Sequence, residues 1–136
     1  MKLLGLDVGT VRIGVATSDI LEMLASPYDV YKRRTLYLDA RYIVELAESL
    51  GAGKIVFGLP LKLDGTEGTS AEMARELAEK VKSQTSLPIV FQDERLSTVS
   101  AERILIETGN SRSKRKEKID AVAASIILQN YIDKTK

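Results

Sequence analysis

The apolar pattern of this chain changes its period once, after residue 34. Up to that point, short apolar runs separated by turn residues predict three β-strands that pair as a meander. Beyond it, apolar residues recur at helical spacing, and the predicted helices alternate with short runs of β-forming residues. The strands are expected at residues 2–8, 12–17, 28–34, 54–59 and 88–91, and the helices at 38–50, 70–83, 98–107 and 118–132.

This order of elements constrains the fold strongly. Strands joined by tight turns pair antiparallel, whereas strands connected through helices pair in parallel. The chain is therefore expected to form an α/β fold with a mixed sheet, antiparallel on one side and parallel on the other. Its 136 residues are enough to bury one core, and no linker or repeat interrupts them. Residues 1–136 are expected to form a single domain.

Three residue types are missing from the chain: histidine, cysteine and tryptophan. Their absence excludes a Ser-His-Asp triad, a cysteine nucleophile, a Cys/His zinc site and any disulfide. Any catalysis must therefore use carboxylates, hydroxyls, lysines, arginines or a bound metal. The net charge of +1 gives no general attraction to nucleic acid, so a nucleic-acid surface would have to be a local patch.

The hydrophobic segments are short. None approaches the roughly 20 residues that a helix needs to span a bilayer. The residues after Met1 also become polar too soon for a signal peptide. The chain is therefore expected to be cytoplasmic and to have no membrane partner.

Asp7 interrupts a strand that is otherwise apolar. A strand buried on both faces does not hold a carboxylate without a partner, so Asp7 is a candidate functional residue. The alternative interpretation is a turn-forming aspartate, because the sequence from Asp7 to Thr10 is also favourable for a hairpin. In that case Gly9 and Thr10 make an ordinary turn. In the functional interpretation they let the backbone come close to a phosphate or a metal-bound water.

Two acids, Asp93 and Glu94, end the strand predicted at 88–91. Ligands of open α/β sheets bind outside the carboxyl ends of parallel strands, so the position suits chemistry. Alternation along a strand places the two side chains on opposite faces, and only one of them can point toward Asp7. The alternative is a pair of solvated charges in a loop between a strand and a helix.

Asp120 lies in the first turn of the predicted helix at 118–132, which is apolar almost all round. A carboxylate there can be stabilised by the helix macrodipole alone, or it can face solvent. Considered together with Asp7 and the Asp93–Glu94 pair, it suggests a cluster. Clustered carboxylates bind hard cations such as Mg²⁺, and two such ions about 3.5–4 Å apart can promote phosphodiester displacement.

Four blocks of the sequence resemble the YqgF family, whose members are described as pre-16S rRNA nucleases or as Holliday-junction-resolvase-like proteins. The match runs over nearly the whole chain, in the family's order. The blocks are Leu6–Thr10 with Arg12–Ala16, Gly58–Leu61 with Asp64–Glu67, Asp93–Thr98, and Ile119–Ala124.

The resemblance implies a three-layer ribonuclease H-like fold, in which helices flank a five-stranded sheet of order 3-2-1-4-5 with strand 2 antiparallel. It implies that Asp7, Glu94 and Asp120 are catalytic and bind two Mg²⁺ or Mn²⁺ ions, with Asp93 as the alternative to Glu94. The implied activity is that of a metal-dependent endonuclease on structured nucleic acid, most simply the 5′ end of pre-16S ribosomal RNA. RNA is favoured over branched DNA, the substrate of a Holliday junction resolvase.

Basic residues gather immediately before Asp120. Five of them, against one acid, form a patch suited to phosphate contacts, although a charge run is also typical of a solvated loop. A second patch follows the strand at 28–34, and one arginine adjoins Glu94. The candidate nucleic-acid-binding residues are Lys32, Arg33, Arg34, Arg95, Arg112, Lys114, Arg115, Lys116 and Lys118.

Three other functions are compatible with the sequence. A resolvase that cuts two strands symmetrically would be a two-fold dimer, whereas the expectation here is a monomer or weak homodimer. Asp7 to Thr10 also resembles the phosphate-binding hairpin of sugar kinases and actin-like ATPases, which would indicate a nucleotide-binding module. Finally, the chain could bind nucleic acid without turnover.

The loop at 64–68 is either a flap over substrate or a turn before a helix.

Overall fold

The computed structural model describes residues 1–62, 64–94 and 112–135, and it describes side chains in these ranges except at 112–118. Within them the chain forms five strands and three helices. The strands are β1 (Lys2–Val8), β2 (Arg12–Ser18), β3 (Ala25–Lys32), β4 (Ala52–Leu59) and β5 (Ile89–Asp93). The helices are α1 (Leu36–Leu50), α2 (Thr69–Lys82) and α4 (Arg112–Lys134).

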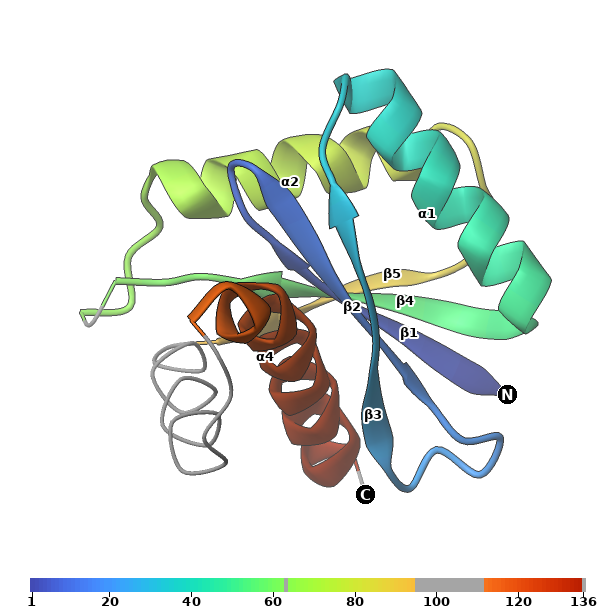
Figure 1. The fold of residues 1–136 in the computed structure, drawn as a ribbon. Coiled ribbons are helices and arrows are strands. Elements are labelled where there is room, and N and C mark those ends of the chain that lie inside the picture. Colours follow the sequence, from blue (N-terminus) through green and yellow to red (C-terminus); the bar gives the residue numbers. More distant parts are fainter. Residues whose placement is uncertain (63, 95–111, 136) are drawn as a thin grey trace.

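The strands form one sheet in the order β3-β2-β1-β4-β5 (Figure 1). Strand β2 is antiparallel to β1 and β3, whereas β4 is parallel to both β1 and β5. The predicted mixed sheet and its order are therefore confirmed. Because β1, β3, β4 and β5 all run in one direction, their carboxyl ends lie along the same edge of the sheet.

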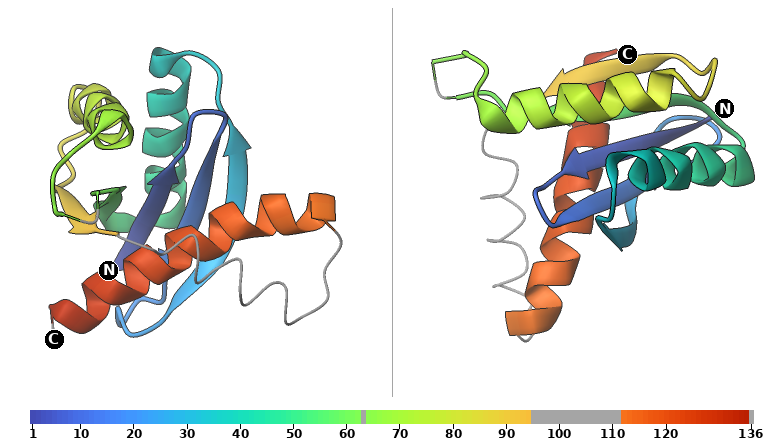
Figure 2. Two further views of the ribbon diagram at one scale, coloured as in Figure 1. Left: turned by 90° about the vertical axis from the view of Figure 1, so that its left-hand side faces the viewer. Right: turned by 90° about the horizontal axis from the view of Figure 1, so that it is seen from above.

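Helices cover both faces of this sheet. Helices α1 and α2 lie on one face, and α4 crosses the other over β1, β2 and β3 (Figures 1 and 2). The larger core lies under α1 and α2 and includes Leu4, Ile43 and Phe57. The smaller core lies under α4, where Leu128 packs with Val56 and other apolar residues. Burying the two faces in this way explains why β1 and β4 have nearly continuous apolar sequences.

Several element boundaries differ from those expected. Helix α4 begins at Arg112, not near residue 118, so the backbone of the basic segment is helical. Arginine, lysine and glutamate are strong helix formers, and this propensity outweighs the polar composition that favoured a loop. Strand β3 is displaced toward the N-terminus and ends at Lys32. The helix expected at 98–107 lies outside the described residues.

The segment before α2 is an ordered turn across the described residues. Leu61 and Glu67 form an antiparallel bridge, and Gly65 has a positive φ of 88°. The Glu67 carboxylate accepts hydrogen bonds from Arg75 of α2, at 2.6 and 2.8 Å. These contacts favour the turn interpretation of residues 64–68 over a flap. None of the helices in the described ranges has the length and apolarity needed to cross a membrane.

Candidate active site

Asp7 lies at the carboxyl end of β1, on the sheet face that α4 covers. Alternation places it on the same face as Gly5, where a Cβ atom would come within 2.8 Å of Leu128 in α4. Across the β1–β2 ladder, Asp7 pairs with Gly14. A Cβ atom at Gly14 would overlap the carbonyl oxygen of Asp120. The absence of a side chain at Gly14 therefore allows the start of the buried part of α4 to lie directly against β2, near Asp7.

Glu94 reaches the same place from the β5 end of the strand order, on the face of the sheet that α4 covers. It follows β5, its N–H donates to the carbonyl of Leu59 at 3.3 Å, and only 7% of its surface is exposed. Its side chain lies over Gly58, where a Cβ atom would come within 3.1 Å of the carboxylate. The neighbouring Asp93 is exposed. The structure therefore brings Glu94, and not Asp93, to Asp7.

The carboxyl groups of Asp7 and Glu94 are hydrogen-bonded to each other. Burial raises the pKa of Asp7 to about 6, the nearby charge of Asp120 also raises it, and the hydrogen bond with Glu94 opposes the rise. A cation bound beside the two carboxyl groups would offset the unfavourable charge that burial and Asp120 impose on Asp7.

Asp120 is close to this pair but is bonded elsewhere. Its Oδ2 accepts a hydrogen bond from Nε of Arg12 at 2.6 Å, and the two side chains are 24% and 36% exposed, respectively. Within the described ranges, no three acidic side chains are arranged closely enough to hold a metal ion. The oxygen donors of Asp7 and Glu94 nevertheless fit Mg²⁺, which takes one or two carboxylates and keeps several waters. The Oδ2 atom of Asp120 can join them only after it leaves Arg12.

The Gly9–Thr10 turn is fixed by a buried ion pair. The N–H of Gly9 donates to the carbonyl of Arg12 at 2.9 Å, and Nη1 of Arg33 donates to the carbonyl of Gly9 at 3.1 Å. Nε of Arg33 donates to the buried Asp39 in α1 at 2.9 Å. Arg33 thus connects the turn to α1 and is only 13% exposed, unlike Lys32 and Arg34. Thr10 is exposed.

Replacing Asp39 with asparagine should lower the free energy of unfolding by about 2 kcal/mol, because a charged hydrogen bond to Arg33 is lost in a buried setting. Urea unfolding would measure this. Glu45→Gln is the matched control, since it breaks an exposed pair with Arg41 and should change stability by less than about 0.5 kcal/mol. Equal losses in the two variants would show that the buried pair has no special role.

The remaining predicted site residues are described by the structure in part or not at all. The patch at residues 112–118 precedes Asp120 in α4, and only its backbone is described. Arg95 lies outside the described residues. Sequence reasoning did not assign roles to Arg12, Gly14 and Gly58. An isolated glycine inside a strand signals close approach by another segment, and this signal could have identified Gly14 and Gly58.

A family model and the sequences of related proteins both match nearly the whole chain. The family model for RuvX, described as Holliday junction resolvase, matches residues 1–134. A protein of Endomicrobium trichonymphae named "Putative pre-16S rRNA nuclease" is 45% identical, over 97% of this chain and 95% of its own length. A protein of Paracoccus denitrificans with the same name is 46% identical, over 97% of this chain and 84% of its own length.

Solved structures resemble the fold as well. RuvC of Thermus thermophilus, in complex with a Holliday junction substrate, has a TM-score of 0.61 at 13% identity. The match covers 99% of this chain and 95% of the RuvC chain. The Fowlpox virus resolvase, bound to Holliday junction DNA, has a TM-score of 0.62 at 8% identity, with 99% of both chains covered. At such identities the likeness concerns the fold, and it confirms the predicted ribonuclease H-like class.

Proposed function

The chain belongs to the RuvX family, also called YqgF, and on that premise we propose that it is a metal-dependent endonuclease that hydrolyses phosphodiester bonds in structured nucleic acid. The observation that carries the proposal is the contact between the buried carboxyl groups of Asp7 and Glu94 at the edge of the sheet. The preferred substrate is the precursor of 16S ribosomal RNA, cut near its 5′ end during ribosome biogenesis. The nuclease is a single domain, residues 1–136, acting in the cytoplasm.

Asp7 and Glu94 would hold Mg²⁺ or Mn²⁺, and Asp120 would complete the set for two ions once it leaves Arg12. Bound ions supply Lewis-acid catalysis to phosphodiester hydrolysis. The protein's own contribution is to bind and orient. Asp7 and Glu94 would present their carboxylate oxygens to the cation, and the Gly9–Thr10 turn would approach the substrate backbone.

Substrate phosphates would be bound by the cations along the same edge. Lys32 and Arg34 are exposed where β3 ends, which is the edge that carries Asp7. Arg95 and the basic residues at the start of α4 are the other phosphate contacts that we propose. Contacts of this kind set affinity and register and carry no sequence information. The protein would work as a monomer or weak homodimer.

Branched DNA is the second candidate substrate. The description of the RuvX family and the fold shared with resolvases favour it. Because symmetric cleavage of a four-way junction needs two sites, this function predicts a two-fold dimer on the junction.

A cleavage panel tests both candidates. Wild-type protein is incubated with 16S ribosomal RNA precursor, single-stranded RNA and a four-way DNA junction, each with Mg²⁺, Mn²⁺ or EDTA. We expect cleavage of the precursor that EDTA abolishes. Junction cleavage by a dimer would reassign the substrate, and binding without cleavage of any substrate would contradict the nuclease proposal.

Glu94→Gln and Asp93→Asn make a matched pair for the same assay. The first removes a carboxylate in contact with Asp7 and should lower the cleavage rate at least about 100-fold. The second removes the exposed neighbouring charge and should leave the rate within about 3-fold of wild type, because alternation places Asp93 on the opposite face of the sheet from Glu94. The opposite ranking would assign the role to Asp93.

A further inference from the structure

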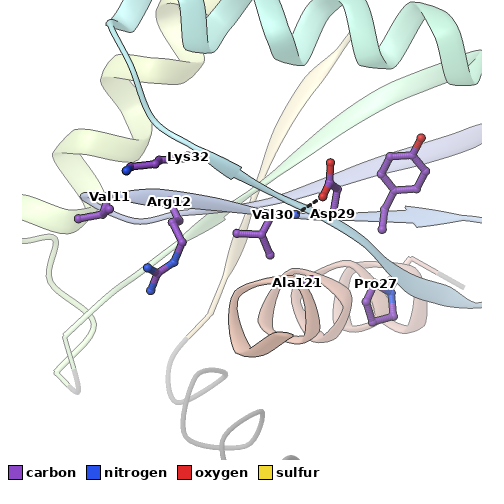
Figure 3. Close-up of a pocket in the computed structure, with 8 residues that line it drawn as sticks. Val11, Arg12, Pro27, Asp29, Val30, Lys32 and Ala121 are labelled. Atoms are coloured by element: carbon purple, nitrogen blue, oxygen red, sulfur yellow. Dashed lines mark hydrogen bonds between the residues drawn. The ribbon is translucent and has the colours of Figure 1, made fainter. Parts of the chain in front are cut away.

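A cavity of about 700 Å³ opens beside Arg12, on the face of the sheet that α4 covers (Figure 3). Its volume is in the range of small-ligand sites. The two ends of the cavity have different side chains (Figure 3). Arg12 and Lys32 lie together at one end, and Pro27 lies toward the other, with Val30 between them and Ala121 of α4 below.

The cationic end adjoins the acids of the proposed active site. Arg12 pairs with Lys32 across the β2–β3 ladder, so the two cations are neighbours on one edge of the sheet. Arg12 also contacts Asp120, which lies over Gly14 beside Asp7. Neighbouring strands are about 4.8 Å apart, so β3 lies about 10 Å from β1. The cavity, which is lined by residues of β2 and β3, therefore begins one strand away from Asp7.

The contact between Arg12 and Asp120 is the kind that a phosphate can replace. Guanidinium groups bind carboxylates and phosphates with the same planar fork geometry. Both side chains remain partly exposed, at 36% and 24%, so a substrate can reach them. If Arg12 turns to a phosphate, the carboxylate of Asp120 becomes free to face Asp7.

We propose that this cavity receives the nucleotide next to the cleaved phosphodiester, with its phosphate on Arg12 and Lys32 and its sugar and base against Val30 and Ala121. Binding of the nucleotide exchanges the partner of Arg12 from Asp120 to phosphate. Arg12 is thus a positioning residue as well as a phosphate contact, since it controls when Asp120 is available to a cation. This inference rests on the proposed nuclease function.

The test uses binding, not cleavage. A fluorescent single-stranded RNA is titrated in Ca²⁺, and Mn²⁺ affinity is measured calorimetrically in the absence of RNA, for the wild type and Arg12→Gln. We expect the variant to bind RNA about 10-fold more weakly, with a salt dependence reduced by about one phosphate contact. We expect it to bind Mn²⁺ about 5-fold more tightly, because Asp120 no longer has a competing partner.

Two further variants make the result specific. Val30→Asp places a negative charge in the cavity wall and should weaken RNA binding about 10-fold. Lys82→Gln removes an exposed cation from the last turn of α2, far from the sheet edge that carries Asp7, and should change neither affinity. Thermal melting confirms that each variant is folded.

The outcomes separate this proposal from the nuclease assignment. Unchanged RNA and Mn²⁺ affinities in folded Arg12→Gln, or unchanged RNA affinity in folded Val30→Asp, would overturn the nucleotide site even if the wild type cleaves its substrate. Conversely, the expected affinity changes would support the site even if no substrate in the cleavage panel were cut, in which case only the nuclease function would fail.

Discussion

Replacing Asp7 with asparagine should lower the cleavage rate at least about 1000-fold and, at neutral pH, should make the protein more stable. The rate falls because asparagine cannot supply the anionic oxygens that a divalent cation needs at the centre of the site. The stability rises because the charge on Asp7 is unfavourable in the folded protein, where burial and the nearby charge of Asp120 both disfavour it.

The sign of the pH dependence follows from the raised pKa of Asp7, which is about 6 in the folded protein against 3.8 as its ordinary value. Between these values the folded protein retains a proton that the unfolded chain releases. The free energy of unfolding therefore falls as pH rises from about 4 to about 6, by about 3 kcal/mol in total. Asp7→Asn lacks this loss of stability. Its Tm should therefore equal that of the wild type near pH 4 and exceed it by roughly 10 °C above about pH 6.

Melting curves of both proteins in EDTA from pH 4 to pH 8 measure this difference. EDTA is needed because a bound cation would stabilise only the wild type. Glu76→Gln serves as the control, since its carboxylate is exposed on α2 and its melting curve should follow that of the wild type. Parallel pH profiles for wild type and Asp7→Asn would contradict the account of Asp7 as a buried, destabilising charge. Undiminished cleavage by the variant would contradict its role as a cation ligand.

Local sequence patterns predicted the framework of this fold because they act over short distances. A carboxylate in an apolar strand identified Asp7, and alternation correctly separated Asp93 from Glu94. Which of those two acids faces Asp7 depends on the pairing of β4 with β5, where Leu59 lies beside Asp93, and on the space over Gly58. That register is a property of the assembled sheet, so the segment alone could not decide it.

The contact between Arg12 and Asp120 was beyond prediction for a related reason. The two residues are 108 positions apart, and they meet only because α4 crosses β2 at Gly14. The patterns of both segments are equally consistent with a helix that crosses elsewhere. Helix α4 begins earlier than its charge pattern indicates because the helix propensity of its lysines and arginines is high. The assigned roles of the acids stay predictions until variants are measured.

The crossing of α4 over β2 leads to the second large expected effect. Gly14→Ala should lower the free energy of unfolding by about 3 kcal/mol or more, because the added Cβ overlaps the carbonyl oxygen of Asp120. The atoms nearest the added Cβ all belong to the backbone of Asp120 and Ala121, so a rotamer change cannot relieve the overlap, and α4 must move away from the sheet. The smaller core, which includes Leu128, would then lose part of its packing.

Gly53→Ala is the matched control for this substitution. Gly53 also lies inside a strand, β4, but its added Cβ would meet the sulfur of Met1 at 2.9 Å. Met1 is 69% exposed and flexible, so it can move aside, and the change in stability should stay within about 0.5 kcal/mol. Thermal melting and urea unfolding of both variants would separate the two cases, with Gly14→Ala expected to melt roughly 10 °C below the wild type. If both alanine variants melted together with the wild type, α4 could not lie against Gly14, and the route by which Asp120 reaches Asp7 would have to be abandoned.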